Sequence, residues 1–187
     1  MIVTGSLVYA QQMRAVFLDR DGTIIVDPPD ERVDKAEKIK LFPDSIEALR
    51  KLATLDYAVI LVTNQAGISE GLINEEEFWK LHTIVLEKLA PSGITILKTY
   101  ICACPHGHDN CGCRKPKPTM LLQASKELNI DLEDSWMVGD RQSDILAGVN
   151  AGTKTILVKT ANVPVESKEA TYTASNLLDA VQYISTH

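Results

Sequence analysis

A short apolar strand that ends in two aspartates constrains this chain more than any other feature. Residues 15–18 form an apolar run typical of a buried strand, and Gly22 breaks the pattern where a strand gives way to a loop. Asp19 and Asp21 lie two residues apart, so both carboxylates can point into the crevice at the strand's carboxyl end, where open α/β sheets bind ligands. Mg²⁺ relieves the repulsion between such carboxylates. The stretch therefore suggests phosphate chemistry, with one aspartate as nucleophile and the other as proton shuttle.

Two further apolar strands also end in polar side chains. Because Asp and Gly are common turn residues, the first stretch taken alone is as compatible with a plain turn as with a functional site. However, a second strand ends in a hydroxyl and two amides at residues 63–65. A third ends in Asp140, with Asp144 four residues further on. Three strands that end in complementary polar groups favour one functional site over three unrelated turns.

Strand-like and helix-like segments alternate along the chain. Strands are expected at residues 15–18, 57–62, 94–101, 136–139 and 153–158 and near Tyr172, and helices after Phe42 and at residues 74–89, 117–128, 144–150 and 176–184. This alternation predicts β-α-β units with right-handed crossovers. We therefore expect an α/β fold, a Rossmann-like doubly wound parallel sheet in one domain of residues 13–187. Residues 1–12 precede the first strand and are expected to be an N-terminal extension.

Composition narrows the class of protein. The 187 residues are 45% hydrophobic, enough for one well-buried domain. The net charge of −6 and the lack of a long Lys/Arg run do not indicate a basic surface for binding nucleic acid. No apolar stretch approaches 18 residues, and the opening residues lack a signal peptide's basic region. We expect a cytoplasmic monomer without nucleic-acid or membrane partners.

All four cysteines fall within the loop of residues 102–113. Disulfide frameworks spread their cysteines apart, whereas a tight cluster in a cytosolic chain indicates metal binding. Thiolates and imidazoles at this density suit tetrahedral Zn²⁺, and free thiols in a surface loop are the alternative. A tetrahedral site has four ligand positions, and six residues are candidates for them: Cys102, Cys104, His106, His108, Cys111 and Cys113. A site formed by the four cysteines alone is one of the open alternatives.

Four motifs in order resemble the haloacid-dehalogenase-like phosphohydrolases: Asp19-x-Asp21-Gly22-Thr23, Thr63, Lys115 and Gly139-Asp140-x-x-x-Asp144. The resemblance covers residues 13 to about 158. It implies a phosphomonoesterase that needs Mg²⁺ and works through an aspartyl-phosphate. The related subfamily has no large cap domain, and this chain has no room for one.

The resemblance also implies a role for each matching residue. Asp19 would be the nucleophile and Asp21 the general acid and base. Thr63 and Lys115 would bind the phosphate. Asp19, the backbone carbonyl of Asp21 and Asp140 would hold Mg²⁺.

Four more residues are candidates with an open alternative. Asp144 has the position of a second acid at the metal site, and a cap for the following helix is equally favoured. Asn64 is expected to bind substrate, although it can also fix its own loop. Arg114 and Arg141 neighbour Lys115 and Asp140 in sequence, and a bidentate phosphate contact is at least as favoured for them as a solvated surface position.

The cysteine loop resembles that of one subfamily within this family. Cys-Pro-His followed by Cys-x-Cys-Arg-Lys-Pro is similar to the zinc loop of the D-glycero-D-manno-heptose 1,7-bisphosphate phosphatases and the histidinol-phosphate phosphatases. This similarity selects Cys104, His106, Cys111 and Cys113 as ligands of a structural zinc and leaves Cys102 on the strand. Such a zinc would fix Arg114 and Lys115 beside the phosphate.

Two loops resemble different enzymes of the subfamily. The sequence therefore predicts a small phosphorylated metabolite as substrate without deciding between two candidates. Residues 64–71 resemble the heptose enzymes of lipopolysaccharide core biosynthesis, whereas residues 28–34 resemble histidinol-phosphate phosphatases. We expect removal of the 7-phosphate of the heptose bisphosphate, with histidinol phosphate as the alternative. A zinc-stabilised binding domain without turnover is disfavoured because Asp19, Asp21, Lys115 and Asp140 are all present.

Overall fold

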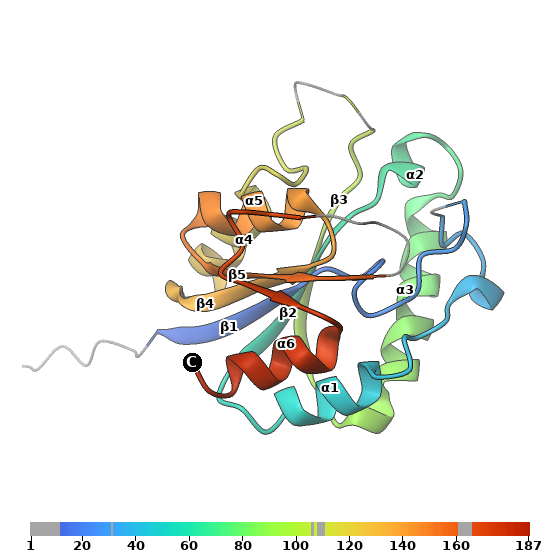
Figure 1. Cartoon of the computed structure of the whole chain (residues 1–187). Helices are drawn as coiled ribbons and strands as arrows, with labels where there is room; N and C mark the ends of the chain where they lie inside the picture. The colour runs from blue at the N-terminus through green and yellow to red at the C-terminus, as the bar shows by residue number, and fades with distance from the viewer. Residues whose placement is uncertain (1–11, 31, 106, 108–110, 161–165) are drawn as a thin grey trace, which may run out of the picture.

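The structure is a computed structural model that describes residues 12–30, 32–105, 107, 111–160 and 166–187 (Figure 1). Its centre is a six-stranded sheet in the order β3-β2-β1-β4-β5-β6, in which all neighbouring strands are parallel. The strands are β1 (Met13–Leu18), β2 (Ala58–Asn64), β3 (Ile96–Cys102), β4 (Ile130–Gly139), β5 (Lys154–Val158) and β6 (Tyr172–Ala174). The expected doubly wound parallel sheet is confirmed.

Helices cover both faces of the sheet (Figure 1). They are α1 (Ser45–Leu52), α2 (Ala66–Ser69), α3 (Glu75–Leu89), α4 (Thr119–Leu128), α5 (Gln142–Ala151) and α6 (Leu177–Ile184), with short 3₁₀ turns at Ala36–Lys38 and Ala90–Ser92. One apolar core joins the sheet to α1, α3 and α6, and a second joins it to α4 and α5. Among the described residues, no helix is both long and apolar enough to span a bilayer.

Strand β1 is central and buried on both faces. Val16 and Leu18 belong to one core, while Ala15 and Phe17 belong to the other, because successive side chains of a strand point to opposite faces. From β1 the chain runs outward through β2 and β3 and then returns to β4 on the other side of β1. The carboxyl ends of β1 and β4 therefore flank a topological switch point, where doubly wound sheets bind ligands.

Local sequence explains where α3 begins. The Asn74 side chain accepts a hydrogen bond from the Glu77 backbone N–H at 2.9 Å, and the Glu77 carboxylate accepts one from the Asn74 N–H at 2.8 Å. This reciprocal capping box satisfies two backbone donors that the first turn leaves unpaired. The expected helix start at residue 74 is confirmed.

Strand β4 begins earlier than the expected residue 136. Ile130 and Asp131 pair with the start of β1, and the register then shifts before Trp136 pairs with Val16. The Ser135 hydroxyl accepts the Ala15 N–H at 2.9 Å and so fills the gap in the ladder. A side chain therefore continues pairing where the backbone bulges.

Candidate active site

Most of the residues singled out at the strand ends line one cavity of about 300 Å³, while Asp140 and Gln65 lie outside its lining. It lies at the carboxyl ends of β1 and β2 and beside the start of α5. Its lining consists of Asp19, Asp21, Thr63, Asn64, Arg114, Lys115, Arg141, Ser143 and Asp144. Chain segments that are up to 125 residues apart in sequence thus meet at one point, as the three polar strand ends predicted.

Lys115 lies at the centre of this site. Its ammonium Nζ is 2.6 Å from Asp19 Oδ1 and 2.6 Å from Asp144 Oδ1. It also donates a hydrogen bond to the Val62 carbonyl at 2.8 Å. All three charged side chains are buried, and the two carboxylates raise the pKa of Lys115 although burial alone lowers it. Lys115 is therefore a fixed positive charge beside the Asp19 carboxylate.

Three buried carboxylates, Asp19, Asp140 and Asp144, approach one another at this end of the sheet. One oxygen from each lies within 4.8 Å of the others. Burial raises the pKa of Asp19 to about 7, with repulsion from Asp144 and Asp21 adding to the shift and Lys115 opposing it. Burial and the Asp19 charge raise the pKa of Asp140 to about 8. Three clustered acids, of which Asp19 and Asp144 also pair with Lys115, form a donor set for a divalent cation.

Asp140 and Gly22 add two observations that fit a cation. Asp140 Oδ2 is buried and accepts no hydrogen bond among the described residues, with Arg141 Nε 4.0 Å away, so its lone pairs are available to coordinate a cation. Gly22 adopts φ +78°, and a Cβ at this position would lie 2.3 Å from Asp140 Oδ2. Glycine therefore allows the Asp21 backbone to pass directly beside the acid cluster.

Asp21 is held by two side chains whose contacts the sequence did not reveal. Arg20 Nη2 donates to Asp21 Oδ2 at 2.8 Å, and Gln65 Nε2 donates to the same oxygen at 2.6 Å. Gln65 also donates to the Thr63 hydroxyl at 2.9 Å. The only sequence signal for Gln65 was its place directly after the strand-end amide. Ser143, which also lines the cavity, gave no signal.

Asn64 joins the end of β2 to the segment that carries Lys115. Its side-chain oxygen accepts the Lys115 N–H at 3.1 Å, and its amide donates to the Lys115 carbonyl at 3.3 Å. Asn64 thus fixes the backbone of Lys115 while it lines the cavity. Both alternatives considered for Asn64 are compatible with this position.

Asp144 makes the cap contact that was considered for it and also lies in the acid cluster, where its role as a metal ligand stays a prediction. Its Oδ2 accepts the Arg141 backbone N–H at 2.9 Å, which caps α5, and its Oδ1 forms the ion pair with Lys115. Arg141 Nη2 lies 3.0 Å from Asp27 Oδ2, and Arg114 Nη1 donates to the Cys104 carbonyl at 3.1 Å. Both arginines also line the cavity.

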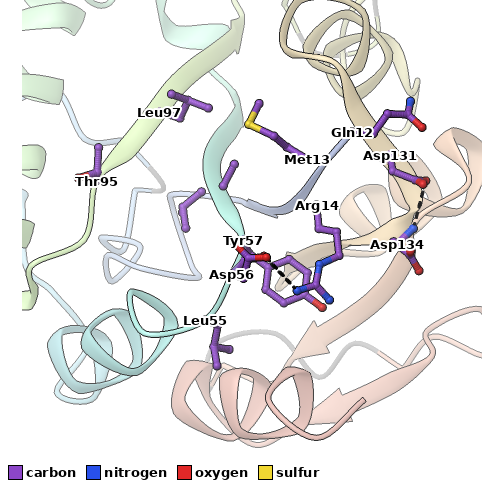
Figure 2. Close-up of a pocket in the computed structure, with 12 residues that line it drawn as sticks. Gln12, Met13, Arg14, Leu55, Asp56, Tyr57, Thr95, Leu97, Asp131 and Asp134 are labelled. Atoms are coloured by element: carbon purple, nitrogen blue, oxygen red, sulfur yellow. Dashed lines mark hydrogen bonds and ion pairs between the residues drawn. The ribbon is translucent and has the colours of Figure 1, made fainter. Parts of the chain in front are cut away.

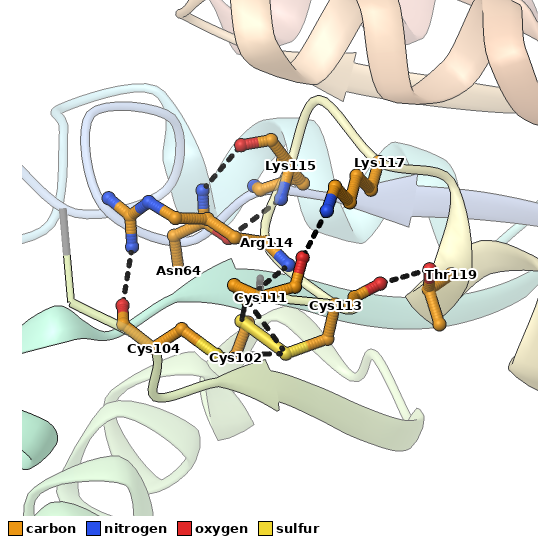
Figure 3. The surroundings of a disulfide bond; sticks show 10 residues. Asn64, Cys102, Cys104, Cys111, Cys113, Arg114, Lys115, Lys117 and Thr119 are labelled. Atoms are coloured by element: carbon orange, nitrogen blue, oxygen red, sulfur yellow. Dashed lines mark hydrogen bonds between the residues drawn. A yellow bond between two sulfur atoms is a disulfide. The ribbon is translucent and has the colours of Figure 1, made fainter. Parts of the chain in front are cut away.

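Four sulfurs cluster beside this cavity (Figure 3). The Cys102 and Cys113 sulfurs are joined in a disulfide, and the Cys104 and Cys111 sulfurs lie close to them. Three of the four expected zinc ligands, Cys104, Cys111 and Cys113, are therefore together. Cys102, which the family similarity left on the strand and the cysteine count left as a candidate, lies with them. His106 lies outside the described residues, so its role as a ligand remains a prediction.

Among the described residues, two other cavities lie at ends of the sheet's strands. One of about 740 Å³ is found at the amino ends of β1 and β2, where Arg14 and Tyr57 line it, at the opposite end of β1 from Asp19 (Figure 2). The other, of about 380 Å³, adjoins the site because Asn64 lines both. Arg32 and Glu70 are among the residues around this adjoining cavity.

Known proteins match this chain in sequence and in structure. Residues 112–181 match a family model described as HAD-hydrolase-like. The chain is 41% identical to a D-glycero-beta-D-manno-heptose-1,7-bisphosphate 7-phosphatase from Pasteurella multocida, over 91% of this chain and 96% of the relative. The chain belongs to the haloacid-dehalogenase-like phosphatase family. The expectation of an enzyme of this family is thereby confirmed.

A solved structure and a bifunctional relative complete the comparison. A D,D-heptose 1,7-bisphosphate phosphatase from B. bronchiseptica, crystallised with magnesium and phosphate, superposes with a TM-score of 0.83 at 26% identity, covering 93% of this chain and 99% of that one. A histidine biosynthesis bifunctional protein HisB from Spirosoma linguale is 38% identical over 80% of this chain, but over only 39% of its own length. This phosphatase chain therefore matches the heptose enzymes over nearly their whole length.

Proposed function

We propose that this phosphatase removes the 7-phosphate of D-glycero-D-manno-heptose 1,7-bisphosphate, with Mg²⁺ as cofactor. The observation that carries the proposal is the 41% identity to the Pasteurella multocida enzyme across 96% of that enzyme's length. The cavity next to the site supports it, since Arg32 offers a positive charge to a second, distal phosphate of a bisphosphate substrate.

In the proposed reaction, Asp19 attacks phosphorus and forms an aspartyl-phosphate while the bond to the sugar oxygen breaks. Lys115 and the Thr63 hydroxyl bind the phosphate oxygens. Asp21 gives a proton to the leaving sugar oxygen and then takes one from the water that releases phosphate from Asp19. One carboxyl group thus serves both half-reactions.

Asp19, the Asp21 carbonyl and Asp140 are proposed to hold Mg²⁺, with Asp144 as a further candidate ligand. A bound Mg²⁺ ion screens the carboxylate from the phosphate and offsets charge on the transferring oxygens. Arg114 and Arg141 line the cavity and are proposed to bind substrate together with Asn64.

We also propose a structural zinc in the cysteine loop, with Cys104, Cys111 and Cys113 among its ligands. Thiolate sulfurs at this density suit tetrahedral zinc. Residues 1–12 are proposed to lie outside the catalytic domain of residues 13–187. We further propose that the protein is a cytoplasmic monomer that binds no nucleic acid.

Histidinol phosphate is the second candidate substrate, supported by the 38% identity to HisB over 151 residues. The test is phosphate release with Mg²⁺ from both compounds, compared as kcat/KM, with Asp19→Asn as the inactive control. We expect at least a hundredfold preference for the heptose bisphosphate, about 2.7 kcal/mol of transition-state discrimination. The opposite preference would identify histidinol phosphate as the substrate. If wild type and control were equally inactive on both, the substrate would be a different compound, and equal inactivity of the two proteins on a generic phosphate ester with Mg²⁺ would instead favour the binding-domain alternative.

A further inference from the structure

Two Cys-x-Cys pairs face each other between β3 and α4. Cys102 ends β3 and Cys104 follows two residues later, while Cys111 and Cys113 form the second pair. The four sulfurs lie within 4.8 Å of one another, and Figure 3 shows the side chains of both pairs converging on the same space.

The distances between the sulfurs have the scale of a metal site. Cys111 Sγ lies 3.4 Å from Cys102 Sγ and 3.7 Å from Cys113 Sγ, and Cys104 Sγ lies 3.8 Å from Cys113 Sγ. In a tetrahedral zinc site with Zn–S bonds of about 2.3 Å, the sulfurs are about 3.8 Å apart. The disulfide between Cys102 and Cys113 needs only two sulfurs and gives no reason for the other two to gather around it.

Cys102 is fixed by the sheet rather than by the loop. It pairs with Asn64 in the β2–β3 ladder, and its carbonyl accepts the Gln65 N–H at 2.7 Å. Its side chain is completely buried. The Cys102 sulfur is therefore held at one place beside the other three.

Positive groups offset the charge of several thiolates. The Arg114 backbone N–H donates to Cys111 Sγ at 3.3 Å, and the Lys117 ammonium donates to the Cys111 carbonyl. The Arg114 guanidinium donates to the Cys104 carbonyl. Such donors stabilise metal-bound thiolates by charge and by orientation.

We propose that the zinc site of this chain is a four-thiolate site formed by Cys102, Cys104, Cys111 and Cys113. Cys102 takes the fourth place, which the family resemblance gives to His106. The inference rests on the proposed zinc and is independent of the proposed substrate. It couples the end of β3 directly to Cys113 and hence to Lys115, two residues further on.

The test is the zinc content of protein purified under reducing conditions, measured by elemental analysis. We expect one zinc per chain in the wild type and in His106→Gln, and well under half of that in Cys102→Ser. Retention of zinc by Cys102→Ser together with its loss from His106→Gln would overturn the proposal.

A second measurement needs no variant and covers the case in which Cys102→Ser fails to fold. Zinc-edge X-ray absorption of the wild type is expected to give four sulfur neighbours at about 2.3 Å. Three sulfurs and one nitrogen would assign the fourth place to a histidine. A reduced wild type without zinc would overturn the proposal and leave the four cysteines as thiols. Neither measurement uses phosphate release, so failure here is distinct from failure of the proposed function.

Discussion

The Arg20 guanidinium binds the carboxylate of its sequence neighbour, Asp21. Its Nε lies 3.2 Å from both carboxylate oxygens and its Nη2 lies 2.8 Å from one of them. The Arg20 side chain is only 1% exposed, and its guanidinium lies over the Phe78 ring, 5.1 Å from the centroid. Arg20 does not line the cavity, so it acts on the reaction by positioning Asp21.

Replacing Arg20 is therefore expected to affect kcat more than KM. In Arg20→Met the packing volume is retained but the fork that orients Asp21 is lost, and we expect kcat to fall about 10- to 100-fold. Arg20→Lys keeps the charge without the bidentate geometry and should lie between Met and wild type. Steady-state kinetics measures both constants. A rise in KM at unchanged kcat would contradict a positioning role.

Lys115 is expected to matter for both stability and turnover. Lys115→Met leaves Asp19 and Asp144 buried without their cation and beside Asp140, so we expect a loss of about 3–5 kcal/mol in the free energy of unfolding. Mg²⁺ should recover more of this loss in the variant than it adds to wild type, because it replaces the missing charge. Thermal unfolding with Mg²⁺ or EDTA measures this difference.

Lys80→Met is the matched control for Lys115→Met, since the ion pair that Lys80 forms with Glu76 in the described part of the chain is exposed. It should change neither the Mg²⁺ dependence nor kcat. In Lys115→Met, kcat should fall at least a hundredfold. Equal Mg²⁺ effects on all three proteins would disprove the cation site at these carboxylates.

Gly22→Ala should disrupt the acid cluster itself. The alanine Cβ would lie 2.3 Å from Asp140 Oδ2, and the residue would also occupy a left-handed backbone conformation at φ +78°. Gly93→Ala is the control, because Gly93 has φ +76° with no atom within 4 Å of the added Cβ. Both variants should lose about 1–2 kcal/mol for the backbone, and only Gly22→Ala should also lose Mg²⁺-dependent stabilisation and turnover. Calorimetry and phosphate release test the pair.

The sequence predicted the parts of the fold that short patterns determine. Apolar runs located β1 and β2, and Asn74 with Glu77 located the start of α3. Helix α2 was missed because its four residues are too few to carry a helical period. The early start of β4 was missed because its pairing depends on the Ser135 hydroxyl, which the local sequence does not indicate.

The same limit applies to the site. Residues at strand ends could be predicted, because parallel strands bring their carboxyl ends to one edge. The inward direction of Arg20 could not, since it depends on Phe78, 58 positions away, and arginine is usually exposed. The approach of Cys102 to Cys111 depends likewise on how the loop returns to β3.

A chain that begins at Met13 is expected to retain activity. The Met13 N–H already donates to the Asn129 carbonyl at 3.0 Å, which ties the start of β1 to the sheet. The nearest cavity to this end lies at the amino ends of the strands, away from Asp19. We expect kcat/KM within twofold of the full chain. A loss of more than tenfold would assign residues 1–12 to the catalytic unit.

His82 is expected to make stability depend on pH between about 4 and 6.5. Burial, followed by the nearby Arg20 charge, lowers the pKa of His82 from 6.5 to about 4. Its Nε2 lies 3.0 Å from the Thr99 hydroxyl, and its buried Nδ1 has no partner among the described residues. Between these two pKa values the unfolded chain binds more protons than the folded one, so stability is full above pH 6.5 and falls as the pH decreases.

His82→Gln cannot titrate and keeps an amide for Thr99, so it should lack this contribution. We expect the free energy of unfolding of wild type to fall by up to about 3 kcal/mol more than that of the variant between pH 7 and pH 4. Urea unfolding at several pH values measures the difference, and the shared acidic groups cancel in it. Parallel pH profiles for the two proteins would mean that His82 accepts its proton in the folded state as readily as in the unfolded one.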